Sequence, residues 1–320
     1  MQLTELSIII PVRNIEREIS GILRSVAAQT AGHEVELIVV DMGSVDQTVL
    51  EAVQLIKELR LRGFVIQNGD GPVSAALNTG ISKSGGDYIT FIFARRLYQN
   101  FINGYLDTAQ RTSADFVFGS VGETDSRVAE RRLLAKTAKT ESGTDCLKRI
   151  LSGTLPIDIS AVLIRRQLVG NRQIRFFDQC DYGYAEEFVF RCLLAAERIV
   201  QSPVILKRDT VLELKRGKQK PVGKNIFQHV DAMQRILDLF KNGQYDDPEL
   251  AGILEKQKIP FTVMNGVDIV LKEGVKYNAV RAYLRASGYE KLLKTGRQTD
   301  FALKRRILLW QTMPWMYKAK

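Results

Sequence analysis

The sequence contains few of the residues that bind transition metals or act as nucleophiles. Its 320 residues include only two histidines, His33 and His229, which lie far apart along the chain. It has three cysteines, Cys146, Cys180 and Cys192, and no CxxC pair. A histidine-based catalytic triad and a zinc site built from Cys and His are therefore nearly excluded. The cysteines are expected to be buried thiols rather than parts of a disulfide framework.

Long hydrophobic runs are also missing. The N-terminal apolar run Ile8–Val12 is closed by Pro11 and Arg13 and follows no basic stretch, so it does not resemble a secretion signal. No run approaches the ~20 apolar residues that a helix needs to cross a bilayer. These features predict a cytoplasmic protein, either soluble or attached peripherally to a membrane.

Acidic residues become scarce in the last third of the chain. Residues 1–200 carry 23 Lys and Arg against 24 Asp and Glu, whereas residues 201–320 carry 23 against only 12. The net charge of +10 therefore comes from the C-terminal part. A basic segment of this kind predicts an anionic partner, either a nucleic acid or a membrane surface.

Short β-rich runs alternate with helical patterns through the first 210 residues. The strand-like runs are Leu6–Val12, Val35–Val40, Phe64–Ile66, Tyr88–Phe93 and Phe116–Phe118. This alternation predicts an α/β fold with a mostly parallel sheet, helices on both faces, and ligands beyond the carboxyl ends of the strands. Helical apolar spacing follows in the basic part. The sequence thus predicts an α/β domain over residues 1–210 and a helical, basic extension over residues 211–320.

Five short motifs occur in an order typical of one enzyme family. They are Ser7–Asn14 (SIIIPVRN), Ser25–Thr30 (SVAAQT), Leu37–Asp46 (LIVVDMGSVD), Val73–Ile81 with Gly86–Phe91, and Ala185–Arg191 (AEEFVFR). Together they resemble family 2 glycosyltransferases of the GT-A fold over residues 5–205. The resemblance implies a nucleotide-sugar donor and inverting transfer of its sugar to a glycan or lipid-linked acceptor.

The resemblance also implies roles for particular residues. In the family, an aspartate after the second strand contacts the nucleobase, and a carboxylate on a later helix deprotonates the acceptor hydroxyl. Carried onto this sequence, the nucleotide-sugar-binding candidates are Pro11, Asn14, Asp41, Asp46, Asn78, Arg95 and Arg96. Glu187 is the candidate catalytic base, with Glu186 beside it. A sugar hydroxyl needs such a base within hydrogen-bond reach as it attacks.

The sequence departs from the family pattern where a metal would bind. The family has L-D-S-D-D after its fourth strand, whereas Ile92–Arg96 reads IFARR. Met42 stands in place of a second acid, and Leu77 in place of an arginine. Because Mg²⁺ and Mn²⁺ require oxygen ligands, we expect no divalent metal here. Arg95 and Arg96 either neutralise the donor diphosphate directly or are ordinary solvated charges.

Several of these residues have a structural alternative. Glu187 either serves as a base or pairs with Arg191, one helical turn away. Asp46 either contacts the nucleotide or caps the helix that follows it. Asn78 either lies under the donor or belongs to a packed helix end. The chain is accordingly either a divergent glycosyltransferase or a catalytically inactive relative that serves as a binding or scaffolding subunit.

Aromatic and basic residues are interleaved in the last segment, Phe301–Lys320. Trp, Tyr and Lys are typical of a bilayer interface, so peripheral contact with an anionic membrane is expected. The helical periodicity is poor, because the three cations of Lys304–Arg306 spread around a helix. The alternative is that Trp310 and Trp315 pack onto the rest of the protein. No motif of a nucleic-acid-binding module is present, so nucleic acid is not expected as a partner.

Overall fold

The computed structural model describes residues 4–93, 97–119, 121–122, 140–202, 206–207 and 223–319. The chain divides into two compact units. The first comprises Met1–Cys146, Gly153–Gln179 and Phe188–Arg216, and the second comprises Leu147–Ser152, Cys180–Glu187 and Gly217–Lys320. Two short segments from the first 210 residues are thus grouped with the helical second unit.

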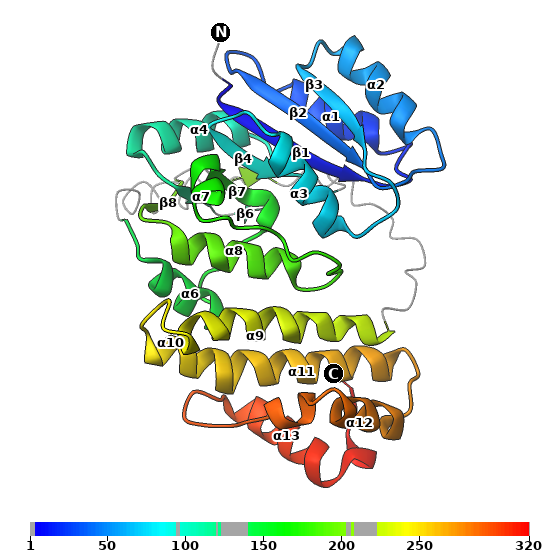
Figure 1. The fold of residues 1–320 in the computed structure, drawn as a ribbon, viewed down its shortest axis with the longest axis vertical. Helices are drawn as coiled ribbons and strands as arrows, with labels where there is room; N and C mark the ends of the chain where they lie inside the picture. Colours follow the sequence, from blue (N-terminus) through cyan, green and yellow to red (C-terminus); the bar gives the residue numbers. More distant parts are fainter. Residues whose placement is uncertain are drawn as a thin grey trace. The chain divides into compact units, whose positions relative to one another are not determined.

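A seven-stranded sheet forms the centre of the first unit (Figure 1). Its strands are β1 (Leu6–Val12), β2 (Val35–Asp41), β3 (Gly63–Gln67), β4 (Tyr88–Phe91), β5 (Phe116–Phe118), β7 (Val162–Arg165) and β8 (Ile199–Gln201). The strand order is β3-β2-β1-β4-β7-β5-β8, and only β7 runs antiparallel to its neighbours. A separate parallel pair joins β6 (Val121–Gly122) to β9 (Leu206–Lys207). The predicted α/β class with a mostly parallel sheet is confirmed.

The sheet carries helices on both faces. The helices of this part are α1 (Ile19–Ala27), α2 (Thr48–Glu58), α3 (Val73–Lys83), α4 (Phe101–Thr112), α6 (Gly143–Leu151), α7 (Arg166–Asn171) and α8 (Tyr184–Ala195), with a 3₁₀ turn at Ile159–Ala161. Successive side chains of a strand point to opposite faces. Ile8 and Ile10 of β1 therefore join the core beneath α1, α2 and α4. Ile9 meets α3, where a Cβ at Gly80 would overlap its side chain, so glycine permits close packing.

The carboxyl ends of the first three strands lie level with one another. Val12 of β1 is paired with Asp41 of β2, and Asp41 is paired with Gln67 of β3. Strand β4 ends earlier, because its last residue, Phe91, is paired with Ile9. The loops after these strands therefore meet at one edge of the sheet, where ligands bind in open α/β sheets.

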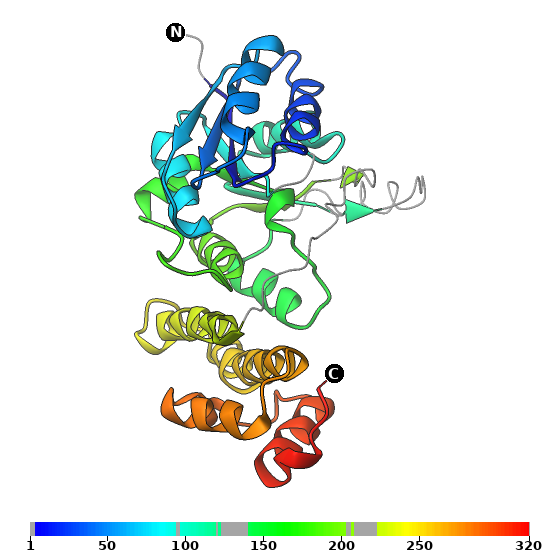
Figure 2. The ribbon, with the colours of Figure 1, turned by 90° about the vertical axis from the view of Figure 1, so that its right-hand side faces the viewer.

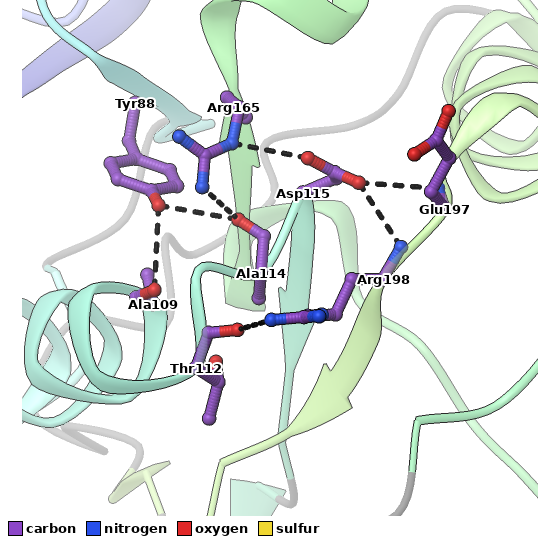
Figure 3. A network of polar contacts seen from close by, with 8 residues as sticks. All are labelled: Tyr88, Ala109, Thr112, Ala114, Asp115, Arg165, Glu197 and Arg198. Carbon is purple, nitrogen blue, oxygen red and sulfur yellow. Dashed lines mark hydrogen bonds and ion pairs between the residues drawn. The ribbon is translucent and has the colours of Figure 1, made fainter.

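The antiparallel strand β7 is tied to its neighbours by a polar network (Figure 3). The Asp115 carboxylate accepts hydrogen bonds from Arg165 Nε at 3.1 Å and from the amides of Glu197 and Arg198 at 3.1 and 3.0 Å. Arg165 also donates to the carbonyl of Ala114 at 3.1 Å, and its guanidinium lies 5.1 Å from the centre of the Tyr88 ring. One carboxylate thereby connects β7, the start of β5 and the turn before β8.

We expect Asp115→Ala to lower the free energy of unfolding by about 2 kcal/mol, since two backbone amides and a guanidinium lose their acceptor. Urea denaturation measures this change. Asp107→Ala is the matched control, because Asp107 pairs with Arg111 on the exposed surface of α4. Such surface pairs contribute about 0.5 kcal/mol. Equal losses in the two variants would contradict the structural role of Asp115.

The second unit is built mainly of helices. These are α9 (Gln228–Lys241), α10 (Pro248–Ile253), a π-helical segment (Leu254–Lys258), α11 (Ile259–Lys272), α12 (Tyr277–Ala286) and α13 (Phe301–Thr312), with 3₁₀ turns at Gly223–Phe227, Tyr289–Leu292 and Pro314–Met316. Helix α11 packs against α9, α12 and α13 (Figure 2). Its central position explains its nearly continuous apolar sequence, with nine buried residues.

Candidate functional site

Asp41 is a buried carboxylate at the carboxyl edge of the sheet. It is the last residue of β2 and is 3% exposed. Its carboxylate accepts hydrogen bonds from the amides of Gly43 and Ser44, at 3.2 Å each. Gly43 adopts a φ of +76°, which favours glycine, so the chain can turn back over the carboxylate. The loop after β2 thus holds one carboxylate in place with backbone donors.

Asn14 connects the loop after β1 to the loop after β2. Its backbone amide donates to Ser44 Oγ at 2.9 Å, and its side-chain Oδ1 accepts from the backbone amide of Val45 at 2.9 Å. The backbone of Asn14 is left-handed, with a φ of 50°, a conformation that asparagine tolerates better than most residues. Asn14 therefore positions the loop that carries Asp41. Pro11, also a candidate, is buried within β1.

Asp46 lies next to Gln47, the N-cap residue of α2, and accepts hydrogen bonds at the start of that helix. Its Oδ1 accepts from the amide and the hydroxyl of Thr48 at 3.0 and 2.6 Å, at the start of α2. Its Oδ2 accepts from the amide of Glu16 at 3.2 Å. Burial acts to raise the pKa of Asp46, but these hydrogen bonds outweigh it and lower the pKa below its usual value. The carboxylate stays ionised, and its hydrogen bonds join the loops after β1 and β2.

Asn78 lies on α3 and holds a distant loop. Its Nδ2 donates to the carbonyl of Phe176 at 2.8 Å and to Asp178 Oδ1 at 2.9 Å. Its Oδ1 accepts from the amide of Phe176 at 2.9 Å. The same loop is packed by aromatic rings, since Phe176 stacks on Phe188 with centroids 3.9 Å apart. The side chain of Asn78 therefore forms hydrogen bonds with this loop, through both its nitrogen and its oxygen.

The positions that depart from the family pattern are partly described. Met42 and Leu77 are both buried, so these two apolar replacements belong to the core. Arg95 and Arg96 lie outside the described residues, which stop at Phe93 and resume at Leu97. Within the described ranges, no group of three or more His, Cys, Asp or Glu side chains could hold a metal ion.

Glu186 and Glu187 lie at the start of α8, in the short segment Cys180–Glu187 of the second unit, and each has strong partners within that unit. Glu186 Oε1 accepts from Lys258 Nζ at 2.7 Å, and its Oε2 lies 2.6 Å from His229 Nε2. Glu187 is 3% exposed and accepts a bidentate pair from Arg235, with Nε at 3.0 Å and Nη2 at 2.6 Å. The sequence suggested Arg191, one helical turn away, as a partner of Glu187; the structure shows a bidentate ion pair with Arg235 of α9.

Burial acts to raise the pKa of Glu186, but the hydrogen bond from His229 and the charge of Lys258 outweigh it and lower the pKa to about 2. The native state therefore binds its proton only at lower pH than the unfolded chain does. Stability from this group is present above about pH 4.5 and is lost as the pH falls toward 2.

We expect the free energy of unfolding to fall with acidification by up to about 1.4 kcal/mol per pH unit from this group between pH 4.5 and 2. Denaturant titrations at a series of pH values should show a shallower fall for Glu186→Gln. Glu58→Gln, at an exposed position on α2, is the control and should keep the wild-type slope. A wild-type slope in Glu186→Gln would contradict the assignment.

Comparison with known proteins identifies the family. The model of the family described as "Glycosyl transferase family 2" matches residues 7–167, which is half of the chain. The chain belongs to glycosyl transferase family 2. The match includes the carboxyl edge with Asn14, Asp41, Asp46 and Asn78, and it ends before α8.

Curated relatives match this family 2 protein over part of their length. An uncharacterized glycosyltransferase of Haemophilus influenzae is 37% identical over 93 residues, which are 29% of this chain and 36% of that protein. A PGL/p-HBAD biosynthesis glycosyltransferase of Mycobacterium bovis is 33% identical over 124 residues, 36% of this chain and 46% of the relative. In these alignments the chain spans less than half the length of the curated relatives it matches.

Solved structures show the same fold over nearly the whole chain. S. aureus TarS 1–349 has a TM-score of 0.70 and 18% sequence identity, covering 96% of this chain and 87% of that one. A second TarS 1–349 structure, in complex with UDP-GlcNAc, has the same TM-score and coverage at 17% identity. At this identity the likeness concerns the fold. In the described part of the family 2 protein, no helix is both long and apolar enough to cross a membrane.

No motif in the sequence indicates the partners of the α8 carboxylates. His229, Arg235 and Lys258 lie 43 to 72 positions after them, on helices with no motif. One residue that could have indicated a close contact with another element is Gly183, just before α8. Its φ is +83°, and a Cβ there would lie 2.7 Å from His229 Cδ2, so only glycine permits this approach to α9.

Proposed function

We propose that the chain is a divergent glycosyltransferase that moves a sugar from a nucleotide-sugar to a hydroxyl of a glycan or lipid-linked acceptor, with inversion. Membership of family 2 supports glycosyl transfer in general. The observation that carries the donor site is Asp41, a buried carboxylate held by two backbone amides at the carboxyl edge. A fixed acceptor of this kind suits an N–H of a nucleobase. TarS, which shares the fold, has a structure with UDP-GlcNAc, which supports a donor of this class.

The proposed reaction is a single in-line displacement. The acceptor oxygen attacks the anomeric carbon while the bond to the diphosphate breaks, and the nucleoside diphosphate leaves with its negative charge. The hydroxyl proton passes to a carboxylate, for which Glu187 remains our candidate. Glu186 is a poor base, because its pKa is lowered to about 2 by His229 and Lys258 despite its burial. Residues 1–210 would perform the transfer, with residues 211–320 as an appendage at the cytoplasmic membrane face.

The leaving diphosphate needs positive charge, which a divalent metal supplies in most of the family. The residues present do not fit a metal, since Ile92–Arg96 offers no carboxylate and Asp46 is occupied by Thr48 and Glu16. We propose that Arg95 and Arg96 offset this charge directly, so that transfer does not depend on a divalent metal.

Calorimetric titration of the full chain with UDP, GDP, ADP and their common sugar conjugates tests the proposal. We expect one of them to bind, with the same affinity in EDTA as in Mn²⁺, and a hydrolysis or transfer assay to show turnover in EDTA. An absolute requirement for Mn²⁺ would overturn the metal-free version. If the folded protein binds none of these compounds, the proposal that it is an enzyme is overturned.

The second candidate is an inactive relative that binds or scaffolds. The bidentate contact of Arg235 with the buried Glu187 favours it, because both oxygens of the candidate base accept hydrogen bonds from a guanidinium. The same titration separates the two: nucleotide binding without turnover with any acceptor tried supports the binding subunit.

A further inference from the structure

The outer face of α13 and the turn after it combine large apolar side chains with basic ones. Phe301, Lys304, Arg305 and Leu308 follow the i, i+3, i+4, i+7 spacing of a single helix face, and all four are exposed. Trp315 and Met316 follow in the 3₁₀ turn Pro314–Met316 and are exposed as well. Phe301 is 79% and Trp315 is 64% exposed. We call these six residues the α13 surface.

The opposite side of α13 is anchored in the second unit. Leu303, Ile307 and Trp310 are buried, and Trp310 lies edge-on to the ring of Tyr317 at 5.5 Å. Arg306 donates to Asp268 Oδ2 at 2.8 Å. The hydroxyl of Tyr317 donates to Asp268 Oδ1 at 2.7 Å, which ties the chain after the 3₁₀ turn to α11. The α13 surface is therefore held in place before any partner arrives.

The contacts that anchor α13 also separate Arg306 from the other two cations of the helix. Arg306 is neutralised by Asp268, so it does not contribute to the outer face. Lys304 and Arg305 form no ion pair with any residue that the structure describes, and residues 301–320 contain no Asp or Glu. The charged residues of the outer face are thus all basic. The sequence had suggested instead that the three consecutive cations spread around the helix.

We propose that the α13 surface docks on an anionic lipid bilayer, with Phe301, Leu308 and Trp315 entering the headgroup region and the cations meeting lipid phosphates. Aromatic rings combined with Lys and Arg are typical of a helix that lies in a membrane interface. A two-fold contact between copies of the chain would bring like charges together, which disfavours self-association. A nucleic acid would match the cations but leave the exposed Leu308 and Met316 without a role. The proposal extends the membrane-side setting of the proposed function, and it does not require an active donor site.

Vesicle binding by the full chain tests the proposal. We expect binding to vesicles of phosphatidylcholine with phosphatidylglycerol, weaker binding in high salt, and little binding to phosphatidylcholine alone. The chain has only two tryptophans, and Trp310 is already buried. A blue shift and quenching by brominated lipid should therefore report on Trp315 and be lost in Trp315→Phe, which keeps an aromatic ring.

Two matched pairs of variants locate the contact. Lys304→Glu with Arg305→Glu should weaken binding about 10-fold or more, whereas Lys272→Glu with Lys276→Glu, the same charge change at exposed positions elsewhere in the unit, should change it far less. Leu308→Ser should weaken binding, and Leu50→Ser on α2 should not.

Three results would overturn the proposal. The first is no binding to anionic vesicles, and the second is equal loss in both charge-reversal variants. The third is a dimer, or a nucleic-acid complex, that Lys304→Glu with Arg305→Glu abolishes while vesicle binding persists. Because vesicle binding is measured without nucleotide, its failure is distinguishable from failure of the nucleotide titration.

Discussion

Replacing Glu187 with alanine should lower the free energy of unfolding by about 3 kcal/mol, because it leaves the guanidinium of Arg235 without its acceptor in a partly buried position. Glu187 is 3% and Arg235 23% exposed at the side chain, and two hydrogen bonds join them. A charge-assisted bidentate pair is shielded here from the solvent that weakens surface ion pairs. Urea denaturation of the two proteins measures the difference.

A double variant separates the ion pair from simple loss of volume. Glu187→Leu with Arg235→Met removes both charges and keeps apolar bulk, so it should regain much of the stability that Glu187→Ala loses. Glu58→Ala, at an exposed ion pair on α2, serves as the surface control and should cost little. A loss below about 1 kcal/mol for Glu187→Ala would contradict a stabilising role of this ion pair, given the usual cost of removing one partner of a buried charged pair.

The same residue is our candidate base, so stability and turnover must be measured together. Glu187→Gln retains one hydrogen-bond acceptor but cannot take a proton at neutral pH. If Glu187 is the base, a folded Glu187→Gln protein will bind the nucleotide-sugar and fail to transfer. If it is only an anchor, turnover will follow the fraction of folded protein.

Replacing Asp41 with alanine should weaken binding of the nucleotide that the calorimetric panel identifies about 100-fold, the loss expected when a fixed, charged hydrogen-bond acceptor is removed. The carboxylate is held by the amides of Gly43 and Ser44, so it needs no rearrangement before it meets a ligand. Its removal also leaves those amides without an acceptor and loosens the loop. Titration calorimetry with that nucleotide measures the change.

Two controls keep the Asp41 test informative. Thermal unfolding shows whether Asp41→Ala remains folded at the titration temperature, and Glu58→Ala should bind the same nucleotide like the wild type. An unchanged affinity in a folded Asp41→Ala protein would contradict the role of this carboxylate. The nucleotide affinity of Asp41→Asn should lie between those of the wild type and Asp41→Ala, because the carbonyl oxygen of the new side chain still accepts one hydrogen bond.

The sequence predicted the carboxyl edge of the sheet well because that edge is encoded locally. Apolar runs define β1 and β2, and a strand, its following loop and its pairing partner lie close in sequence. Asp41 and Asn14 could therefore be placed at or just beyond strand ends without a structure. The antiparallel strand β7 was not predicted, because nothing local in Val162–Arg165 specifies its direction. The contact of Asp115 with Arg165, 50 positions away, helps to hold it.

The segment Phe301–Lys320 shows most clearly which features the sequence determines and which the tertiary structure determines. The sequence by itself determined that positive charge and aromatic residues gather in Phe301–Lys320, since composition needs no folding to be read. Only the tertiary structure decided that Trp310 is buried, that Trp315 is exposed, and that Arg306 is neutralised by Asp268. It likewise decided that Glu186 and Glu187 meet His229, Lys258 and Arg235. Ion pairs and burial join residues distant in the chain, and local propensity carries no record of which charge will meet which.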